Sequence, residues 1–152
     1  MKKILISCML FVTTALFAGE IQWAHSYKEA LTLSKKEKKP IMFIMTKSDC
    51  KYCKLLKSTT LKDPKVIARL NKNFINYMVM VDEEGATVPY MLAVYTKGFP
   101  TIWFLNEHGQ ALFQPIGGYM KTEPFLEALD VVGKSYKEYL TKSATPLMKK
   151  GK

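Results

Sequence analysis

Two cysteines in a Cys-X-X-Cys arrangement, Cys50 and Cys53, constrain the fold of this chain more than any other feature. Residues 41–45, shortly before them, form a continuous apolar run of strand length, which is typical of a strand buried on both faces of a sheet. Leu55 and Leu56 continue the chain after the pair as a predicted helix. The sequence therefore places the two cysteines at the junction between a central strand and a helix.

This position predicts a redox role for the pair. The start of a helix presents unpaired backbone N–H groups and the positive end of the helix dipole, and both favour a thiolate. We expect Cys50 to be the nucleophile that attacks a partner's disulfide, and Cys53, one turn later and more buried, to resolve the mixed disulfide. A structural role explains the pair poorly, because a bridge across so short a loop stabilises little.

The N-terminus has the pattern of a secretory signal peptide over residues 1–18. Two lysines precede an uncharged, mostly apolar run at residues 4–17, and the small residue Ala18 follows. A membrane-spanning helix needs roughly 20 apolar residues, so the run predicts a cleaved signal, with an uncleaved anchor as the alternative. Removing it also removes Cys8 and leaves the Cys-X-X-Cys pair as the only cysteines of the predicted mature chain.

The rest of the sequence predicts one domain at residues 19–141 and a basic C-terminal tail at 142–152. Apolar periodicity and turn residues predict the element order α-β-α-β-α-β-β-α. The elements are expected at residues 26–36, 41–45, 50–60 with a restart at 63, 74–81, 89–94, 101–105, 111–115 and 122–140. This alternation of strands and helices predicts an α/β fold.

Metal and haem binding explain the cysteines less well. A structural zinc site needs four ligands at close spacings, whereas His25 and His108 lie far apart in the sequence. A haem attachment signal needs a histidine where Lys54 stands. Methionines on the predicted strands, such as Met42 and Met78, fit a core better than a copper site. We expect no metal and no cofactor.

Four pieces of the sequence occur together in one known family. They are the Cys50–Cys53 pair after the strand opened by Pro40, the helix restart Asp63-Pro64-Lys65-Val66, the segment Gly98-Phe99-Pro100-Thr101 before a strand, and Gly118 after the predicted hairpin. From about residue 39 to 129 the chain resembles the thioredoxin superfamily, and most closely the periplasmic thioredoxin-like domain of transmembrane thiol:disulfide interchange proteins of the DsbD type. The resemblance implies a thioredoxin fold, with a central mixed β-sheet flanked by helices.

By this resemblance Pro100 is the cis-proline that faces the cysteines across the active site. Proline lowers the penalty for a cis peptide bond, and a fixed turn there exposes the backbone of Phe99 to an extended substrate segment. Phe99 and Tyr119 are then expected to form an apolar rim of the substrate-binding groove, with plain packing as the alternative for both. The alternative is an ordinary proline that opens a strand.

The chain departs from the family pattern beside the cysteines. Thioredoxin-like reductases commonly have a buried acid six residues before the first cysteine, where this chain has Ile44. The usual tryptophan before the first cysteine is Asp49, whose charge disfavours a thiolate at Cys50, whereas Lys51 favours it. Tyr52, between the cysteines, resembles disulfide isomerases and reductases more than cytosolic thioredoxins. We expect Asp49, Lys51 and Tyr52 to tune the pair.

Charge excludes one class of partner. The formal charge of +10 falls to +8 without the two lysines of the predicted signal, but the remaining lysines form no aromatic-interleaved basic stripe. We therefore expect no nucleic-acid partner and interpret the lysines as solvated surface, with contact to an anionic membrane surface as the alternative.

The predicted protein is a periplasmic thiol-disulfide oxidoreductase that reduces disulfides of exported proteins. The resemblance implies a membrane protein as electron donor, and a monomer is favoured because no dimerisation segment is evident. Disulfide isomerase or oxidase activity is the near alternative. The alternative from another class is a non-enzymatic module of thioredoxin fold that uses the pair to hold a metal or one client protein.

Overall fold

A four-stranded mixed sheet forms the centre of the computed structural model, which describes residues 19–144. The strands are β1 (Ile41–Thr46), β2 (Ile75–Met80), β3 (Thr101–Leu105) and β4 (Ile116–Gly117), in the spatial order β2-β1-β3-β4. β1 is parallel to β2 and antiparallel to β3, and β4 is antiparallel to β3. The predicted signal peptide at residues 1–18 lies outside the described residues.

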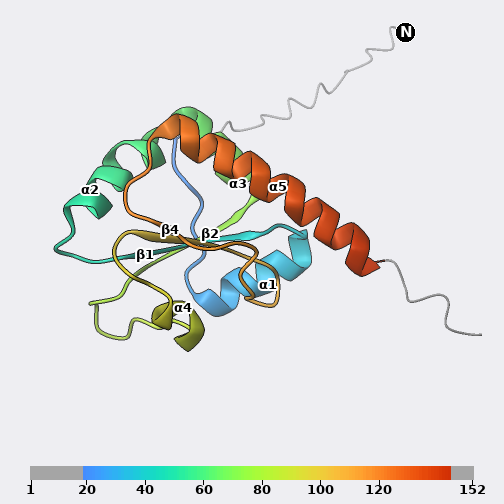
Figure 1. Cartoon of the computed structure of the whole chain (residues 1–152), viewed down its shortest axis with the longest axis horizontal. Helices are drawn as coiled ribbons and strands as arrows, with labels where there is room; N and C mark the ends of the chain where they lie inside the picture. Colours follow the sequence, from blue (N-terminus) through green and yellow to red (C-terminus); the bar gives the residue numbers. More distant parts are fainter. Residues whose placement is uncertain (1–18, 145–152) are drawn as a thin grey trace, which may run out of the picture.

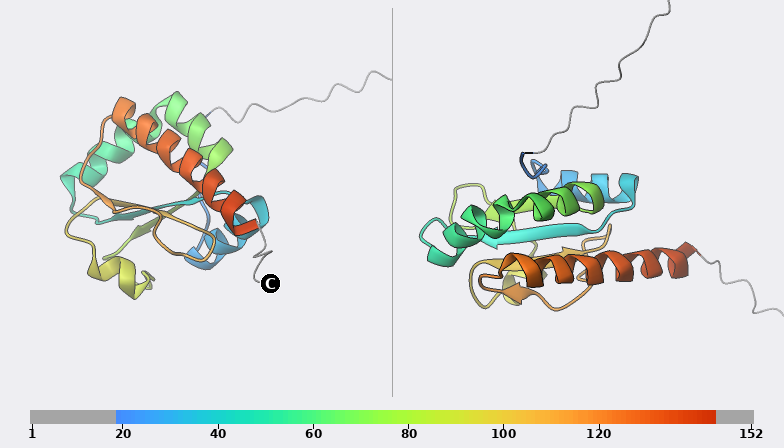
Figure 2. Two further views of the ribbon diagram at one scale, coloured as in Figure 1. Left: turned by 45° about the vertical axis from the view of Figure 1, so that its right-hand side comes forward. Right: turned by 90° about the horizontal axis from the view of Figure 1, so that it is seen from above.

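Helices cover both faces of this sheet, as predicted (Figure 1). α1 (Tyr27–Glu37) and α4 (Tyr90–Val94) lie on one face, whereas α2 (Lys51–Ser58), α3 (Pro64–Asn73) and α5 (Thr122–Ala144) lie on the other. A single 3-10 turn, η1 (Thr60–Lys62), joins α2 to α3. α3 and α5 run side by side (Figure 2), and an ion pair between Arg69 and Asp130 joins them.

Side-chain caps fix where two helices begin. Ser26 caps α1 by accepting a hydrogen bond from the backbone N–H of Glu29 at 3.1 Å. Asp63 caps α3 in the same way, and Pro64 occupies the first turn, where its missing N–H has no cost. Both starts are the predicted ones.

The apolar core is divided by the sheet into two clusters. β1 is buried over its whole length, because Met42 and Ile44 face α2, α3 and α5 while Phe43 and Met45 face α1 and α4. This arrangement confirms the interpretation of residues 41–45 as a strand buried on both faces. The central strand is therefore held rigidly just before the cysteines, which is the position that the chemistry needs.

The prediction that residues 111–115 form the hairpin partner of β3 is wrong. The structure places β4 at Ile116–Gly117, paired with Thr101 and Ile102, and leaves only an isolated bridge at Ala111. Pro115 has no N–H to donate, so it cannot contribute a ladder hydrogen bond between the bridge at Ala111 and β4.

The last helix is longer than predicted. α5 continues to Ala144 instead of ending near residue 140, so the first three residues of the predicted tail at 142–152 are helical. Residues 145–152 lie outside the described residues. Within residues 19–144, no helix has the length and apolar character needed to cross a membrane.

The N-terminal segment before α1 covers part of the β2 edge. Trp23 forms an isolated parallel bridge with Asn76, and the backbone N–H of Ala24 donates to the Asn76 carbonyl at 2.8 Å. Asn71 on α3 holds the same segment, since its side chain accepts from the Gln22 N–H and donates to the Glu20 carbonyl.

Candidate active site

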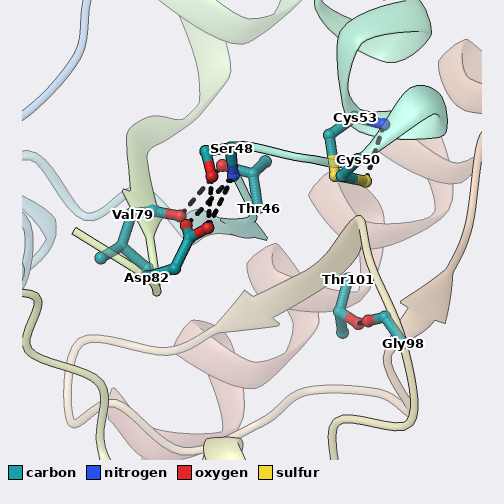
Figure 3. The surroundings of a disulfide bond; sticks show 8 residues. All are labelled: Thr46, Ser48, Cys50, Cys53, Val79, Asp82, Gly98 and Thr101. Atoms are coloured by element: carbon teal, nitrogen blue, oxygen red, sulfur yellow. Dashed lines mark hydrogen bonds between the residues drawn. A yellow bond between two sulfur atoms is a disulfide. The ribbon is translucent and has the colours of Figure 1, made fainter.

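The cysteine pair lies where the loop after β1 enters α2 (Figure 3). Cys50 is the N-cap residue of α2, and its Sγ accepts a hydrogen bond from the backbone N–H of Cys53 at 3.1 Å. The two sulfurs are joined in a disulfide. Cys50 is half-buried, whereas Cys53 is only 1 % exposed. The sulfur that a partner can reach is therefore also the one that receives a helix N–H group.

A carboxylate tethers the loop that leads to this pair. Asp82, just beyond β2, accepts hydrogen bonds from the Ser48 N–H at 3.1 Å and from the Ser48 hydroxyl at 2.5 Å (Figure 3). The hydrogen bond from the Ser48 side chain is the main cause that lowers the pKa of Asp82 below its ordinary value, and Lys47 adds a smaller electrostatic contribution. Asp82 therefore stays ionised and keeps both acceptor oxygens available.

The Phe99–Pro100 peptide bond, on the loop before β3, is cis. Pro100 is buried, and the hydroxyl of Thr101 donates to the Gly98 carbonyl across this turn (Figure 3). The ammonium group of Lys47 lies 5.3 Å from the ring centroid of Phe99, within the range of a cation–π contact. Lys47 thus links the loop before the cysteines to the proline loop.

A groove of about 520 Å³ borders the proline loop, and we call it the Phe99 groove. Its lining residues are Tyr95, Lys97, Gly98, Phe99, Thr101, Gln114, Pro115, Gly117 and Gly118. A methyl group added at Gly98 or Gly117 would meet no atom within 4 Å, and neither glycine has a positive φ. Internal packing does not require glycine at these two positions, so their small size keeps the groove open to another backbone.

The predicted rim of this groove is present only in part. Phe99 lines it, but Tyr119 packs against the core cluster below α2 and α5 and accepts a hydrogen bond from the Thr59 hydroxyl at 3.3 Å. Tyr119 is not among the residues that line the Phe99 groove. Both aromatic residues were expected at the rim from the sequence, and the packing of each side chain distinguishes them.

The predicted tuning residues lie on the surface around the pair. Asp49 and Lys51 are exposed, and Tyr52 is 56 % exposed. Ile44 is fully buried in the core cluster that includes Leu56 of α2. The position at which the family resemblance implies an acid is therefore occupied by a fully buried apolar side chain.

Two contacts of the site had no place in the sequence prediction: Ser48 with Asp82, and Lys47 with Phe99. The first had a usable signal. Ser48 follows β1 and Asp82 follows β2, and neighbouring parallel strands end at the same edge of a sheet. The second depends on the path of the proline loop, for which the sequence holds no comparable signal.

The side chains that could bind a metal ion are spread over residues 19–144 and do not form a cluster. In this part of the chain, no three histidine, cysteine, aspartate or glutamate side chains are grouped closely enough to hold an ion. His25 and His108 are both exposed, in agreement with their interpretation as surface residues. The Nε2 atom of His108 lies 3.4 Å from Oε1 of Glu107, in the turn after β3.

A half-buried cysteine at the cap of a helix, bonded to a buried one a turn later on this mixed sheet, defines a thioredoxin-like thiol-disulfide oxidoreductase. The chain belongs to the family described as thioredoxin-like domain, which matches residues 27–133. This family and the predicted class of enzyme are therefore confirmed.

Individual relatives agree with this family. The chain is 28% identical over 109 residues to the thiol:disulfide interchange protein DsbD of Vibrio vulnificus strain CMCP6, a match that covers 71% of this chain and 18% of that protein. The chain thus spans about a fifth of the curated relative.

Two solved structures share the fold. One is the oxidoreductase DsbH, with a TM-score of 0.62, 23% identity and coverage of 82% of this chain and 92% of that chain. The other is the oxidised C-terminal domain of Neisseria meningitidis DsbD, with a TM-score of 0.53, 21% identity and coverage of 74% and 98%.

Proposed function

We propose that this protein is exported and reduces disulfides in other exported proteins, with Cys50 as the nucleophile and Cys53 as the resolving cysteine. The observation that carries the proposal is the unequal exposure of the two sulfurs. Cys50 is half-buried at the helix cap, whereas Cys53 is 1 % exposed beneath it. A substrate disulfide can reach the first sulfur, and the second sulfur can reach only the first.

The reaction transfers two electrons in two exchange steps. In the first step the Cys50 thiolate attacks one sulfur of the substrate disulfide, a Cys50–substrate bond forms, and the other substrate sulfur leaves as a thiolate. In the second step the Cys53 thiolate attacks the Cys50 sulfur, the Cys50–Cys53 disulfide forms, and the second substrate thiolate leaves. The substrate gains the two electrons that the cysteine pair loses.

The first step is favoured by the local backbone. The Cys53 N–H already donates to the Cys50 sulfur in the oxidised state, and the same donor is available to a Cys50 thiolate. Asp49 and Lys51 flank Cys50 with opposite charges, and both are exposed and therefore screened by solvent. In this proposal the helix start is the main stabilising influence on the thiolate, and the two charged residues tune it.

The Phe99 groove is the proposed binding site for the substrate backbone. Its proline loop carries Phe99, and the absence of side chains at Gly98 and Gly117 leaves room for an extended segment beside β4. A segment in this position adds to the sheet as a further strand, with main-chain hydrogen bonds that do not depend on substrate sequence.

A membrane protein is the proposed electron donor. The donor dithiol would reduce the Cys50–Cys53 disulfide by the same two steps in reverse, and would itself become a disulfide. The similarity to a thiol:disulfide interchange protein over 71% of this chain supports exchange with such a partner. The pattern at residues 1–18 supports export to a compartment that contains disulfide-bonded proteins.

The direction of exchange is tested by the reduction potential of the pair. The purified protein is equilibrated in glutathione buffers, and its alkylated thiols are counted by mass. A value near the thioredoxin range of about −270 mV supports the reductase, whereas a value near about −120 mV makes the protein an oxidant. A pair that never exchanges with glutathione contradicts the proposed reaction altogether.

Export has its own test. The full chain is expressed in a bacterium with a periplasm, and the mass of the periplasmic form is measured. Cleavage after Ala18 gives a chain that begins at Gly19. A full-length chain recovered from the cytoplasm alone contradicts this part of the proposal.

A further inference from the structure

Helix α4 presents an apolar surface to solvent next to the Phe99 groove. Four apolar side chains of the helix and its C-cap residue are largely exposed, namely Tyr90 (79 %), Met91 (60 %), Val94 (55 %) and the C-cap Tyr95 (58 %). We call these residues the α4 patch. The neighbouring Leu92 is buried in the cluster below the sheet, so the helix is anchored and its outward face is fixed. Contiguous exposed apolar surface on a soluble domain typically marks an interaction site.

The α4 patch is continuous with the Phe99 groove. Tyr95 belongs to both, because it ends the patch and also lines the groove together with Lys97 and Phe99. A polypeptide that lies in the groove with its cysteine near Cys50 can therefore continue over Tyr95 onto α4. A small disulfide compound occupies only the region of the sulfur and does not reach the patch.

The charges around the patch favour a polypeptide over a membrane surface. Residues 85–96 contain no charged side chain; the acidic residues Asp82, Glu83 and Glu84 directly precede them, and the single basic residue Lys97 directly follows them. Helices that lie on anionic membranes have lysines and arginines on their polar face, and α4 has none. Tyrosine and methionine adapt to varied apolar partners, so the patch does not demand one client sequence.

We infer that the α4 patch docks exposed apolar segments of incompletely folded proteins whose disulfide is being exchanged at Cys50. This inference rests on the proposed function and names its substrate class. Docking on α4 lowers the KM for unfolded polypeptide disulfides and leaves the reaction with small disulfides unchanged.

The first experiment compares two substrates in one variant. Tyr90→Ser/Met91→Ser removes the two most exposed patch residues, and Val131→Ser, which removes an apolar residue of α5 that is 56 % exposed, is the control. Scrambled ribonuclease A is the unfolded disulfide substrate, and oxidised glutathione is the small one. We expect the double variant to raise the KM for scrambled ribonuclease about tenfold, with the glutathione rate unchanged and Val131→Ser like the wild type. An unchanged KM in the double variant overturns the inference.

A second experiment separates docking from redox chemistry. Reduced, carboxymethylated ribonuclease A has no thiol or disulfide, and its binding to the wild-type protein is measured by fluorescence anisotropy. We expect binding that weakens severalfold in the double variant and is retained in Val131→Ser. If the wild-type protein binds this probe but exchanges no glutathione, docking holds and the proposed function fails.

Other occupants of the patch give different results. A wild-type dimer that the double variant converts to a monomer would assign the patch to a second copy of the chain. Binding to vesicles of phosphatidylglycerol that the double variant abolishes would assign it to a membrane. Either result, without binding of the carboxymethylated probe, overturns the inference.

Discussion

Asp82 accepts hydrogen bonds from both the backbone N–H and the hydroxyl of Ser48, which lies two residues before the first cysteine. The loop that follows β1 and leads to Cys50 is thereby tied to the turn that follows β2, the strand parallel to β1. Ser48, Asp49 and Asp82 are all exposed, so no core packing holds this loop in place. The position of the reactive sulfur therefore depends on a polar contact at the surface.

We predict that Asp82→Ala slows exchange at Cys50 severalfold, because the loop that leads to Cys50 loses the acceptor that holds Ser48. The measurement is the rate of exchange with oxidised glutathione and with a polypeptide disulfide. Glu84→Ala, which removes a nearby exposed carboxylate, is the control and should leave both rates unchanged. Equal rates for wild type and Asp82→Ala would show that the loop holds its position without this contact.

The same contact predicts a pH dependence of stability. The Ser48 hydroxyl is the main reason that the pKa of Asp82 lies below its ordinary value of 3.8. A carboxyl whose folded pKa is lowered contributes stability above its unfolded pKa and loses that contribution as the pH falls through the folded pKa. We expect the difference in Tm between wild type and Asp82→Asn to be constant at neutral pH and to vanish below the lowered pKa. A difference that persists in strong acid would contradict this origin.

The roles of the two cysteines predict unequal trapping of partners. Cys53→Ser leaves the reachable sulfur without its resolving partner, so mixed disulfides through Cys50 should accumulate. Cys50→Ser leaves only the buried sulfur, so few should form. Non-reducing gels after incubation with a disulfide-containing protein measure both. Equal trapping by the two variants would overturn the assignment.

A methyl group added in the Phe99 groove should slow the reduction of polypeptide disulfides and leave exchange with glutathione unchanged. Gly117→Ala fills open space without a backbone or packing conflict, so we expect a change in unfolding free energy within about 0.5 kcal/mol. Reduction of a polypeptide disulfide should slow, whereas glutathione exchange should not. Gly133→Ala on α5 also meets open space and is the control, with both reactions unchanged. A slower glutathione reaction in Gly117→Ala would place the methyl group against the sulfurs.

A second carboxylate anchors α5 to the turn after β3. The Tyr136 hydroxyl donates to Glu107 at 2.7 Å, and the Tyr139 hydroxyl donates to its other oxygen at 3.2 Å. Burial of Tyr136 and the Glu107 carboxylate both raise the pKa of Tyr136, so the phenol remains a donor. We predict that Tyr136→Phe lowers the free energy of unfolding by about 1.5 to 3 kcal/mol, the range for a hydrogen bond to a charged group. Tyr139→Phe, with the longer bond, should cost less in the same urea titration.

Glu107 should also make this anchor sensitive to acid. Burial is the largest single influence on Glu107 and raises its pKa. The hydrogen bonds from Tyr136, from its own backbone and from Tyr139, together with the charge of His108, lower the pKa by more, so that the net value lies below the ordinary 4.5. The stabilising contribution is therefore present above pH 4.5 and is lost as the pH falls through the lowered value. Tyr136→Phe should reduce the acid-induced loss of stability, and an identical pH profile in the variant would refute the link.

The sequence predicts elements well where local chemistry determines them. The caps Ser26 and Asp63 fix the starts of α1 and α3, and the apolar runs fix β1 and β3 within a residue. It fails at β4, where two residues pair after an irregular stretch that ends at Pro115. So short a strand carries no periodicity, and its register depends on the path of the loop before it.

The same distinction applies to the site. Cys50 and Cys53 are only three positions apart in sequence, so their place at the helix start can be predicted from neighbouring residues. The contact between Ser48 and Asp82 joins segments that only the parallel pairing of β1 with β2 brings together. The orientation of Tyr119 toward Thr59 depends on packing between segments far apart in sequence, which a single sequence does not specify.

The half-covered edge of β2 gives the protein a built-in spectroscopic reporter. Trp23, on the segment that bridges to Asn76, is 36 % exposed, whereas Trp103 in the core is 4 % exposed. These are the two tryptophans of the chain, and a soluble quencher such as acrylamide reaches the first far more easily than the second. Detachment of the N-terminal segment would therefore shift the emission of Trp23 while that of Trp103 stays constant, so that fraying of this edge can be followed separately from unfolding of the core.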